Sequence, residues 1–189
     1  MSPRIFAVVF AVIFLAELGD KTQLVLLAMG SRMPWRMVLA GAMAAFLLLN
    51  LLAVTLGALA YRVLPLRALQ VAAGAVMVLF GLLTLLREKD VEKEGVGEKK
   101  VAGPFLASFL MMMAMELGDK TQLSLLALTA RYRMPFSVFL GGTAALWTTS
   151  ALAVLLGGQL QRLIPPMKLR MVAGVVFIIF GLAMCMGIA

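Results

Sequence analysis

The sequence contains no histidine and only one cysteine, Cys185, among its 189 residues. Zinc sites built on histidine, cysteine or histidine nucleophiles, disulfide frameworks and haem-attachment motifs are therefore excluded, and so is a histidine proton relay. Cys185 lies in the apolar stretch GLAMCMGIA, where a buried and unreactive thiol is expected.

Charge is also scarce, because 14% of the residues are charged and 63% are hydrophobic. A soluble domain is usually about 25% charged, so this composition indicates an all-α integral membrane protein. A membrane-spanning helix needs about 20 mostly apolar residues. The hydrophobic runs predict six transmembrane helices, over residues 4–30, 35–61, 66–86, 103–130, 135–161 and 167–187.

The net charge of +8 does not indicate nucleic-acid binding, because the sequence has no basic stripe with interleaved aromatic residues. Apart from Lys21 and Lys120, the basic residues lie between or beside the hydrophobic runs. With six spans, five of them fall on the side of the N-terminus and ten on the other side. The positive-inside rule then predicts a multi-pass protein with a cytoplasmic central loop and both termini outside.

The two halves of the chain are copies of each other, offset by about 100 residues; VAAGAVMVLFGLL at 71–83 matches MVAGVVFIIFGLA at 171–183. Three spans per copy would make the copies two inverted three-helix repeats, as in many secondary transporters, whose sites lie near the bilayer midplane. We therefore expect a first repeat over residues 1–86, a charged cytoplasmic linker over 87–103 and a second repeat over 104–189. Glycines seven residues apart in the third and sixth spans, Gly74 and Gly81, Gly174 and Gly181, are expected to allow close helix packing.

The octapeptide ELGDKTQL occurs twice, at Glu17–Leu24 and at Glu116–Leu123, inside runs that are otherwise apolar. Every acidic residue outside the linker belongs to one of these motifs, namely Glu17, Asp20, Glu116 and Asp119. An ionisable group at membrane depth costs a few kcal/mol and usually faces a cavity or a partner. The alternative is a pair of internal salt bridges that lock helices together, although apolar packing would usually do so without burying ions.

The spacing of each motif predicts that its acids share a helix face, because Glu and Asp are three residues apart. If the two motif helices meet, their carboxylate, hydroxyl and amide oxygens converge without any imidazole or thiolate. Such hard oxygen ligands suit Ca²⁺, Mn²⁺ or Mg²⁺. The candidate metal-binding residues are Glu17, Asp20, Thr22, Gln23, Glu116, Asp119, Thr121 and Gln122.

Proton coupling follows from the same residues. Desolvation and mutual repulsion favour protonated carboxylates in an empty site, and a bound cation favours ionised ones. Four carboxylates with protonated Lys21 and Lys120 carry a formal charge of −2, which matches one divalent ion. The lysines would orient the carboxylates, or stand in for a cation when the site is empty. The candidate proton-coupling and charge-balancing residues are Glu17, Asp20, Lys21, Glu116, Asp119 and Lys120.

Two copies of Glu-x-Gly-Asp-Lys-Thr around a charged central loop resemble the signature of the Golgi-type Ca²⁺/Mn²⁺:H⁺ antiporter family, which includes bacterial manganese exporters. The resemblance implies export of Mn²⁺ or Ca²⁺ from the cytoplasm in exchange for protons, by alternating access and without a cofactor. It also implies that Glu17, Asp20, Glu116 and Asp119 bind the cation, with Lys21, Thr22, Lys120 and Thr121 completing the motifs. Without the N-terminal extension of eukaryotic relatives, the chain is expected in a prokaryotic plasma (inner) membrane.

Other functions compete with this hypothesis. A six-span exporter of amino acids or small solutes would use the lysines to hold a carboxylate and the acids to hold an amine. A membrane-embedded enzyme with paired carboxylates is less favoured, because chemistry on one bond rarely needs two identical copies, and a structural scaffold would not need four intramembrane acids. The run Met111–Met115 suggests a copper(I) site, but the first repeat has no sulfur there. The choice between Mn²⁺ and Ca²⁺, and between a monomer and a homodimer, stays open.

Overall fold

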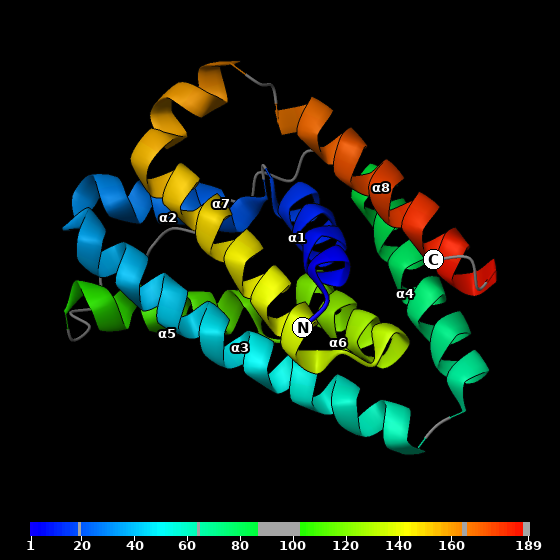
Figure 1. Ribbon diagram of the computed structural model, residues 1–189. Helices are drawn as coiled ribbons and strands as arrows, with labels where there is room; N and C mark the ends of the chain where they lie inside the picture. Colours follow the sequence, from blue (N-terminus) through cyan, green and yellow to red (C-terminus); the bar gives the residue numbers. More distant parts are fainter. Residues whose placement is uncertain (19, 64, 87–102, 164–165, 187–189) are drawn as a thin grey trace.

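The computed structural model describes residues 1–18, 20–63, 65–86, 103–163 and 166–186, and within these ranges it contains eight α-helices and no strand (Figure 1). The predicted all-helical class is therefore confirmed. The predicted linker lies outside the described residues except for Gly103, which precedes α5. The helices are α1 (Pro3–Glu17), α2 (Lys21–Arg32), α3 (Trp35–Val63), α4 (Leu66–Leu86), α5 (Pro104–Glu116), α6 (Lys120–Tyr132), α7 (Pro135–Leu163) and α8 (Pro166–Met186).

The helices predicted over residues 4–30 and 103–130 are each broken in two at the motif. The leucine after each glutamate is extended, with φ −64° and ψ 114° at Leu18 and φ −65° and ψ 110° at Leu117. Gly118 follows with a φ of +82°, a left-handed conformation that glycine adopts readily. The prediction that Glu and Asp share one helix face is therefore wrong, because the chain leaves the helix between them.

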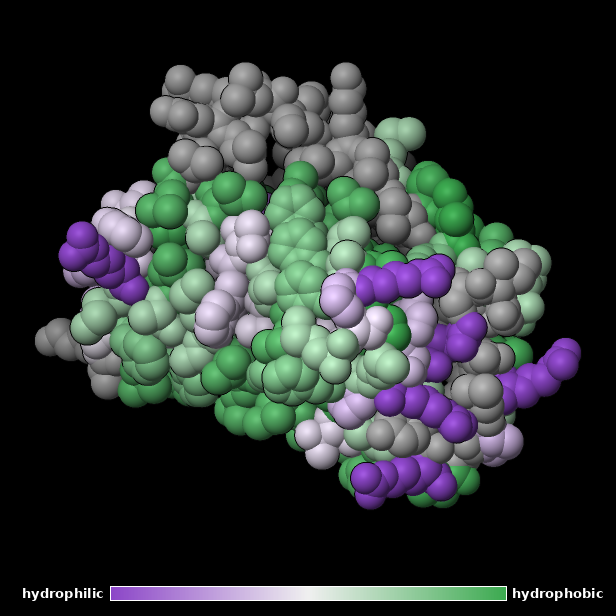
Figure 2. Space-filling view, in the orientation of Figure 1, coloured by the Kyte–Doolittle hydropathy of each residue, from purple (hydrophilic) through white to green (hydrophobic). Residues whose placement is uncertain are grey.

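Two helices, α3 and α7, are long and apolar enough to cross a membrane, over Trp35–Ala60 and Pro135–Leu155. The half-helices beside the breaks are shorter; α1, with 15 residues, is about 22 Å long and falls short of a hydrocarbon core of about 30 Å. Figure 2 shows a face that is mostly hydrophobic, with its most hydrophilic residues gathered toward the left and lower right ends. Such a surface fits contact with lipid.

The long helices pack against the broken ones in a matched way. α3 packs against α5 and α6, and α7 packs against α1 and α2. A Cβ atom at Gly41 of α3 would collide with the backbone of Phe105, and one at Gly141 of α7 would lie 2.8 Å from the carbonyl oxygen of Phe6. Both glycines therefore allow the same close approach of a long helix to the first half of a broken one.

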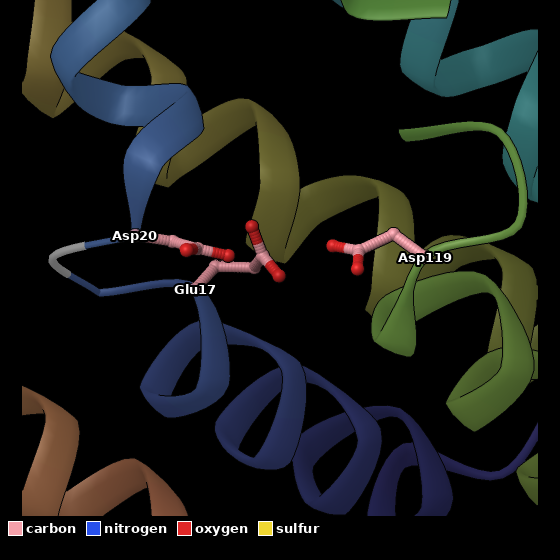
Figure 3. A group of neighbouring side chains, drawn as sticks. All are labelled: Glu17, Asp20 and Asp119. Atoms are coloured by element: carbon pink, nitrogen blue, oxygen red, sulfur yellow. The ribbon is translucent and has the colours of Figure 1, made fainter. Parts of the chain in front are cut away.

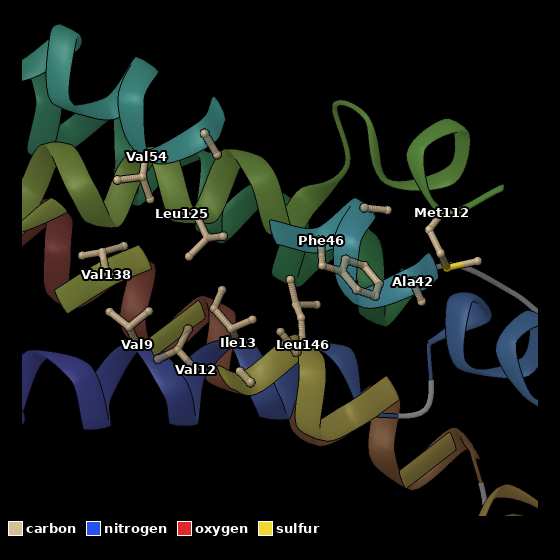
Figure 4. Close-up of a cluster of buried hydrophobic side chains, with 14 of the residues drawn as sticks. Val9, Val12, Ile13, Ala42, Phe46, Val54, Met112, Leu125, Val138 and Leu146 are labelled. Atoms are coloured by element: carbon tan, nitrogen blue, oxygen red, sulfur yellow. The ribbon is translucent and has the colours of Figure 1, made fainter. Parts of the chain in front are cut away.

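The hydrophobic core lies where these helices meet (Figure 4). It includes Val9 and Ile13 of α1, Phe46 of α3, Leu125 of α6 and Leu146 of α7, all at most 2% exposed. The core therefore joins helices from both halves of the chain.

α4 and α8 lie side by side at one end of the molecule (Figure 1). A Cβ atom at Gly181 of α8 would lie 2.7 Å from the carbonyl oxygen of Gly74 of α4, so the predicted glycine packing is confirmed at these two positions. Cys185 of α8 is exposed, with its Sγ 3.7 Å from the carbonyl oxygen of Val71. The expectation of a buried thiol is wrong, because Cys185 lies at the margin of the α4–α8 contact.

Candidate functional site

The two helix breaks face each other near the middle of the molecule. α1 contacts α6 and α2 contacts α5, so the half-helix before each break packs against the half-helix after the other break. Figure 3 shows Glu17 and Asp20 of the first break pointing toward the side of Asp119 of the second. Sequence-distant acids are thus brought together because both motif helices are interrupted at the same position.

Three of the predicted metal ligands form a compact group. One carboxylate oxygen from each of Glu17, Asp20 and Asp119 lies within 4.8 Å of the others. Two oxygens on opposite sides of a Ca²⁺ ion, with bonds of about 2.3–2.6 Å, would be about 5 Å apart. The group therefore has the dimensions and the ligand chemistry of a site for one hard divalent cation.

Two hydrogen bonds cross between the motifs. The Thr121 hydroxyl donates to Oε1 of Glu17, and the Thr22 hydroxyl donates to Oε1 of Glu116. All four residues are at most 2% exposed. Each glutamate is thus oriented by the threonine of the other motif, while the hydroxyl oxygens keep lone pairs of their own.

Glu116, the fourth predicted acid, is not part of the group of three. It lies close enough for its charge to interact with Glu17 and Asp119. Its Oε1 accepts a hydrogen bond from Thr22 of the first motif.

Lys120 reaches from the second motif into the first. Its Nζ lies 2.5 Å from Oδ2 of Asp20 and 3.9 Å from Oε1 of Glu17, and it donates to the carbonyl oxygen of Ala16 at 3.2 Å. The Ala16 carbonyl belongs to the last turn of α1, where helical carbonyls lack partners within the helix. The ammonium is therefore surrounded by three oxygens of the first break. The sequence could not predict that the Ala16 carbonyl contacts Lys120, because every residue has a main-chain carbonyl.

The second motif carries polar atoms without such partners. Oδ2 of Asp119 and Nε2 of Gln122 are buried and lack a hydrogen-bond partner in the described part of the chain. A buried carboxylate oxygen without a partner is costly, so it marks a position where a ligand would be stabilising.

The remaining predicted residues lie beside this arrangement. Gln23 is partly buried at the start of α2. Lys21 begins α2, and its side chain lies outside the described part of the structure.

The comparisons with known proteins agree with this chemistry. The family described as "Divalent cation/proton antiporter GDT1" matches residues 5–92 and 104–188. Protein PAM71, chloroplastic, of Arabidopsis thaliana is 29% identical over 204 residues, which cover 93% of this chain and 55% of PAM71. GDT1-like protein 5 of the same plant is 29% identical over 211 residues and 91% of both chains, and GDT1-like protein 3 of Oryza sativa subsp. indica is 26% identical over 210 residues, 97% of this chain and 75% of its own. No solved structure matches the chain.

These relatives overturn the expected location in a prokaryotic plasma membrane. They are plant proteins, and PAM71 and its homolog are named as chloroplastic, which points to a eukaryotic organellar membrane. That expectation rested on the absence of an N-terminal extension, which does not determine the membrane that a chain enters. Hydrophobic length and the distribution of basic residues do not specify the membrane either.

Proposed function

Because the chain belongs to the GDT1 family of divalent cation/proton antiporters, we propose that it binds one divalent cation between its two helix breaks and exchanges the cation for protons. It is a transporter rather than an enzyme. The observation that carries the site is the group formed by Glu17, Asp20 and Asp119, whose oxygens lie within 4.8 Å of one another.

The transported ion is Mn²⁺ or Ca²⁺, exported from the cytoplasm. Both ions prefer oxygen ligands, and the described site offers carboxylate, hydroxyl and amide groups. The ligand set is Glu17, Asp20, Thr22, Gln23, Glu116, Asp119, Thr121 and Gln122. A single chain supplies both motifs, so one protomer suffices to form the site.

Protons and the cation compete for the same oxygens. In the proposed exchange, the buried carboxylates of Glu17 and Glu116 carry protons when the site is empty and give them up when a cation binds. An ion that enters the site therefore releases protons, and an ion that leaves allows them to return. Exchange then needs no separate proton pathway.

We further propose that the chain spans the membrane six times as two inverted repeats. α1 with α2, and α5 with α6, would each form one interrupted span beside the continuous helices α3, α4, α7 and α8. The repeats would be residues 1–86 and 104–189, joined by the linker 87–103. The matched glycine contacts of α3 with α5 and of α7 with α1 support this symmetry. Interrupted helices at membrane depth are tolerated where they line a binding site.

The test is a flux assay with the purified protein in liposomes that contain a pH-sensitive dye. Addition of Mn²⁺ or Ca²⁺ on one side should drive protons to the other side in a protein-dependent manner, whereas Mg²⁺, which dehydrates reluctantly, should do so weakly. Transport of an amino acid without any divalent ion would instead favour the six-span solute exporter.

A further inference from the structure

We propose that Lys120 is an internal competitor of the transported cation, whose ammonium must leave Asp20 and Glu17 before the metal can bind there. This inference rests on the proposed ion site and assigns different roles to its two halves. The first motif is filled by a cation from the protein itself, whereas in the second motif Oδ2 of Asp119 has no hydrogen-bond partner among the described residues.

The surroundings of the Lys120 ammonium are those of a bound cation. Three oxygens surround it, from Asp20, Glu17 and the Ala16 carbonyl, at 2.5, 3.9 and 3.2 Å. The Ala16 carbonyl also belongs to the C-terminal end of α1, which carries the negative end of the helix dipole. Two of the three donors of the ammonium reach oxygens at hydrogen-bond distance, those of Asp20 and Ala16, and the Glu17 carboxylate adds its charge at 3.9 Å.

The ammonium and a divalent ion need the same atoms. Glu17 and Asp20 contact Lys120 and also belong to the group of three carboxylates whose oxygens lie within 4.8 Å of one another. Two cations at this distance would repel each other strongly, because the site is largely shielded from water; the Lys120 side chain is 13% exposed. Metal binding at these carboxylates therefore requires the ammonium to move away.

The opposite role is that Lys120 holds Asp20 in position for the metal and stays in place when the metal binds. The two roles predict opposite changes in metal affinity when the positive charge is removed. A competitor weakens metal binding, so its removal strengthens it. A positioning residue strengthens metal binding, so its removal weakens it.

The experiment compares Lys120→Met with Lys120→Arg in the purified full-length protein, with Mn²⁺ binding measured by calorimetry. Methionine keeps much of the length of the side chain without its charge, and arginine keeps the charge. Lys120→Met should bind Mn²⁺ about tenfold more tightly, as expected when a hydrogen-bonded ion pair no longer has to be broken, and Lys120→Arg should not. Unchanged or weaker binding by Lys120→Met, in a protein that is monodisperse and melts as the wild type does, would overturn the inference.

The same measurement on the wild type and on Glu17→Gln tests the proposed function separately. If the wild type binds no Mn²⁺ or Ca²⁺, the ion site itself is wrong. If the wild type binds the ion and Glu17→Gln does not, the site stands, and the sign of the Lys120→Met change decides the role of the lysine.

A second inference comes from helix packing and also rests on the proposed transport. We infer that α4 and α8 move together as one unit when access to the site changes from one side of the membrane to the other. α4 packs against α6, and α8 packs against α1. α1 and α6 lie on one side of the two breaks, whereas α2 and α5 lie on the other (Figure 1).

The α4–α8 pair therefore covers only one half of the broken helices. Within the described residues, no comparable contact joins α4 to α5 or α8 to α2. The two-fold symmetry of the repeats exchanges α1 with α5, α2 with α6 and α4 with α8. It would therefore convert the observed contacts, α4 with α6 and α8 with α1, into contacts of α8 with α2 and of α4 with α5. The symmetric counterpart of this arrangement would cover the other half of the site, as alternating access requires.

The contact between α4 and α8 has the closeness expected of a unit that moves intact. The backbones meet at Gly74 and Gly181, where a Cβ atom at Gly181 would lie 2.7 Å from the Gly74 carbonyl oxygen. α4 belongs to the first half of the chain and α8 to the second. Rocking of one intact half against the other would pull this contact apart.

The native Cys185 provides the test. Val71→Cys introduces a second thiol on the residue whose carbonyl oxygen lies 3.7 Å from the Cys185 Sγ, and both residues are exposed. After cross-linking with a short bifunctional thiol reagent, verified by mass spectrometry, the protein should exchange cations at the rate of the untreated variant. Failure to cross-link, or a loss of transport that is absent from Val71→Cys/Cys185→Ser under the same treatment, would overturn the inference. Wild-type transport in the same liposomes reports on the proposed function independently.

Discussion

The two helix breaks have the same eight-residue sequence and nearly the same backbone, yet their acids are partnered differently. Leu18 and Leu117 have φ and ψ values within 4° of each other, and the amides of Asp20 and Asp119 both donate to the carbonyl of the preceding glutamate at 3.1 Å. Asp20, however, has an ion pair with Lys120, whereas Oδ2 of Asp119 is buried without a hydrogen-bond partner in the described structure. Identical local sequence therefore sets the backbone but not the electrostatics.

Under the proposed function, this difference predicts that the two copies contribute unequally to ion binding. The carboxylates of the first break are compensated by a charge within the protein. Asp119 of the second break has a buried oxygen that an ion would satisfy. The four predictions below compare the two copies, beginning with the largest expected effect.

Glu17→Gln and Glu116→Gln should each abolish exchange. The loss of activity should exceed the roughly 10–100-fold loss that follows removal of a residue that only supports a metal ligand. Glutamine can still accept the hydrogen bond from the opposite threonine, so the fold should persist while the charge is lost. Metal-dependent proton flux in liposomes measures this effect. Activity retained by either variant would show that its motif is not part of the site.

Asp119→Asn should weaken Mn²⁺ binding by about 100-fold, and Asp20→Asn by only about tenfold. The second loss is smaller because Asp20→Asn also removes the main partner of Lys120 and so weakens its competition with the metal. Calorimetric titration of both variants at one pH makes the comparison. Equal losses would mean that the inequality in ion pairing has no energetic consequence.

Thr121→Val should weaken Mn²⁺ binding about fivefold, the size of one hydrogen bond, and Thr22→Val should have a smaller effect. Thr121 orients Glu17, which belongs to the group of three carboxylates, whereas Thr22 orients Glu116, which does not. Thr121→Ser and Thr22→Ser keep the hydroxyl and serve as matched controls. A larger loss for Thr22→Val would mean that Glu116, rather than Glu17, contributes more to ion binding.

Ser108→Ala should lower the free energy of unfolding by about 1 kcal/mol and leave transport unchanged. The buried Ser108 hydroxyl of α5 donates to the Val38 carbonyl of α3 at 2.7 Å, whereas the matching position on α1 is Val9. A thermal melt in detergent, with a flux assay alongside, would detect the loss of this bond. Reduced transport by a variant that melts as the wild type does would show that Ser108 takes part in transport and not only in stability.

Much of the fold was predictable because hydrophobic runs and prolines are local signals. Helices begin at Trp35, Leu66 and Pro135, within a residue of the predicted starts, and the close contact at Gly74 and Gly181 was expected from their spacing. The two breaks were not predicted, because the polar motif that interrupts each apolar run is equally compatible with one continuous helix that carries functional side chains. They depend on backbone hydrogen bonds, which no residue type encodes by itself.

The residue types of the candidate site were also predictable, since acids outside the linker occur only in the two motifs. Their partners were not. The bonds from Thr22 to Glu116 and from Thr121 to Glu17 join residues 94 and 104 positions apart, and Lys120 bonds to a main-chain carbonyl. Which lysine pairs with which acid is decided by the crossing of the broken helices rather than by spacing within one motif.

The crossed threonine–glutamate bonds mean that the duplication provides no redundancy. A doubled gene segment often leaves a spare that can be damaged without penalty. Here each glutamate depends on a hydroxyl supplied by the other copy, so damage to either copy misaligns the carboxylate of its twin. Neither repeat can replace the other, because each supplies half of one site.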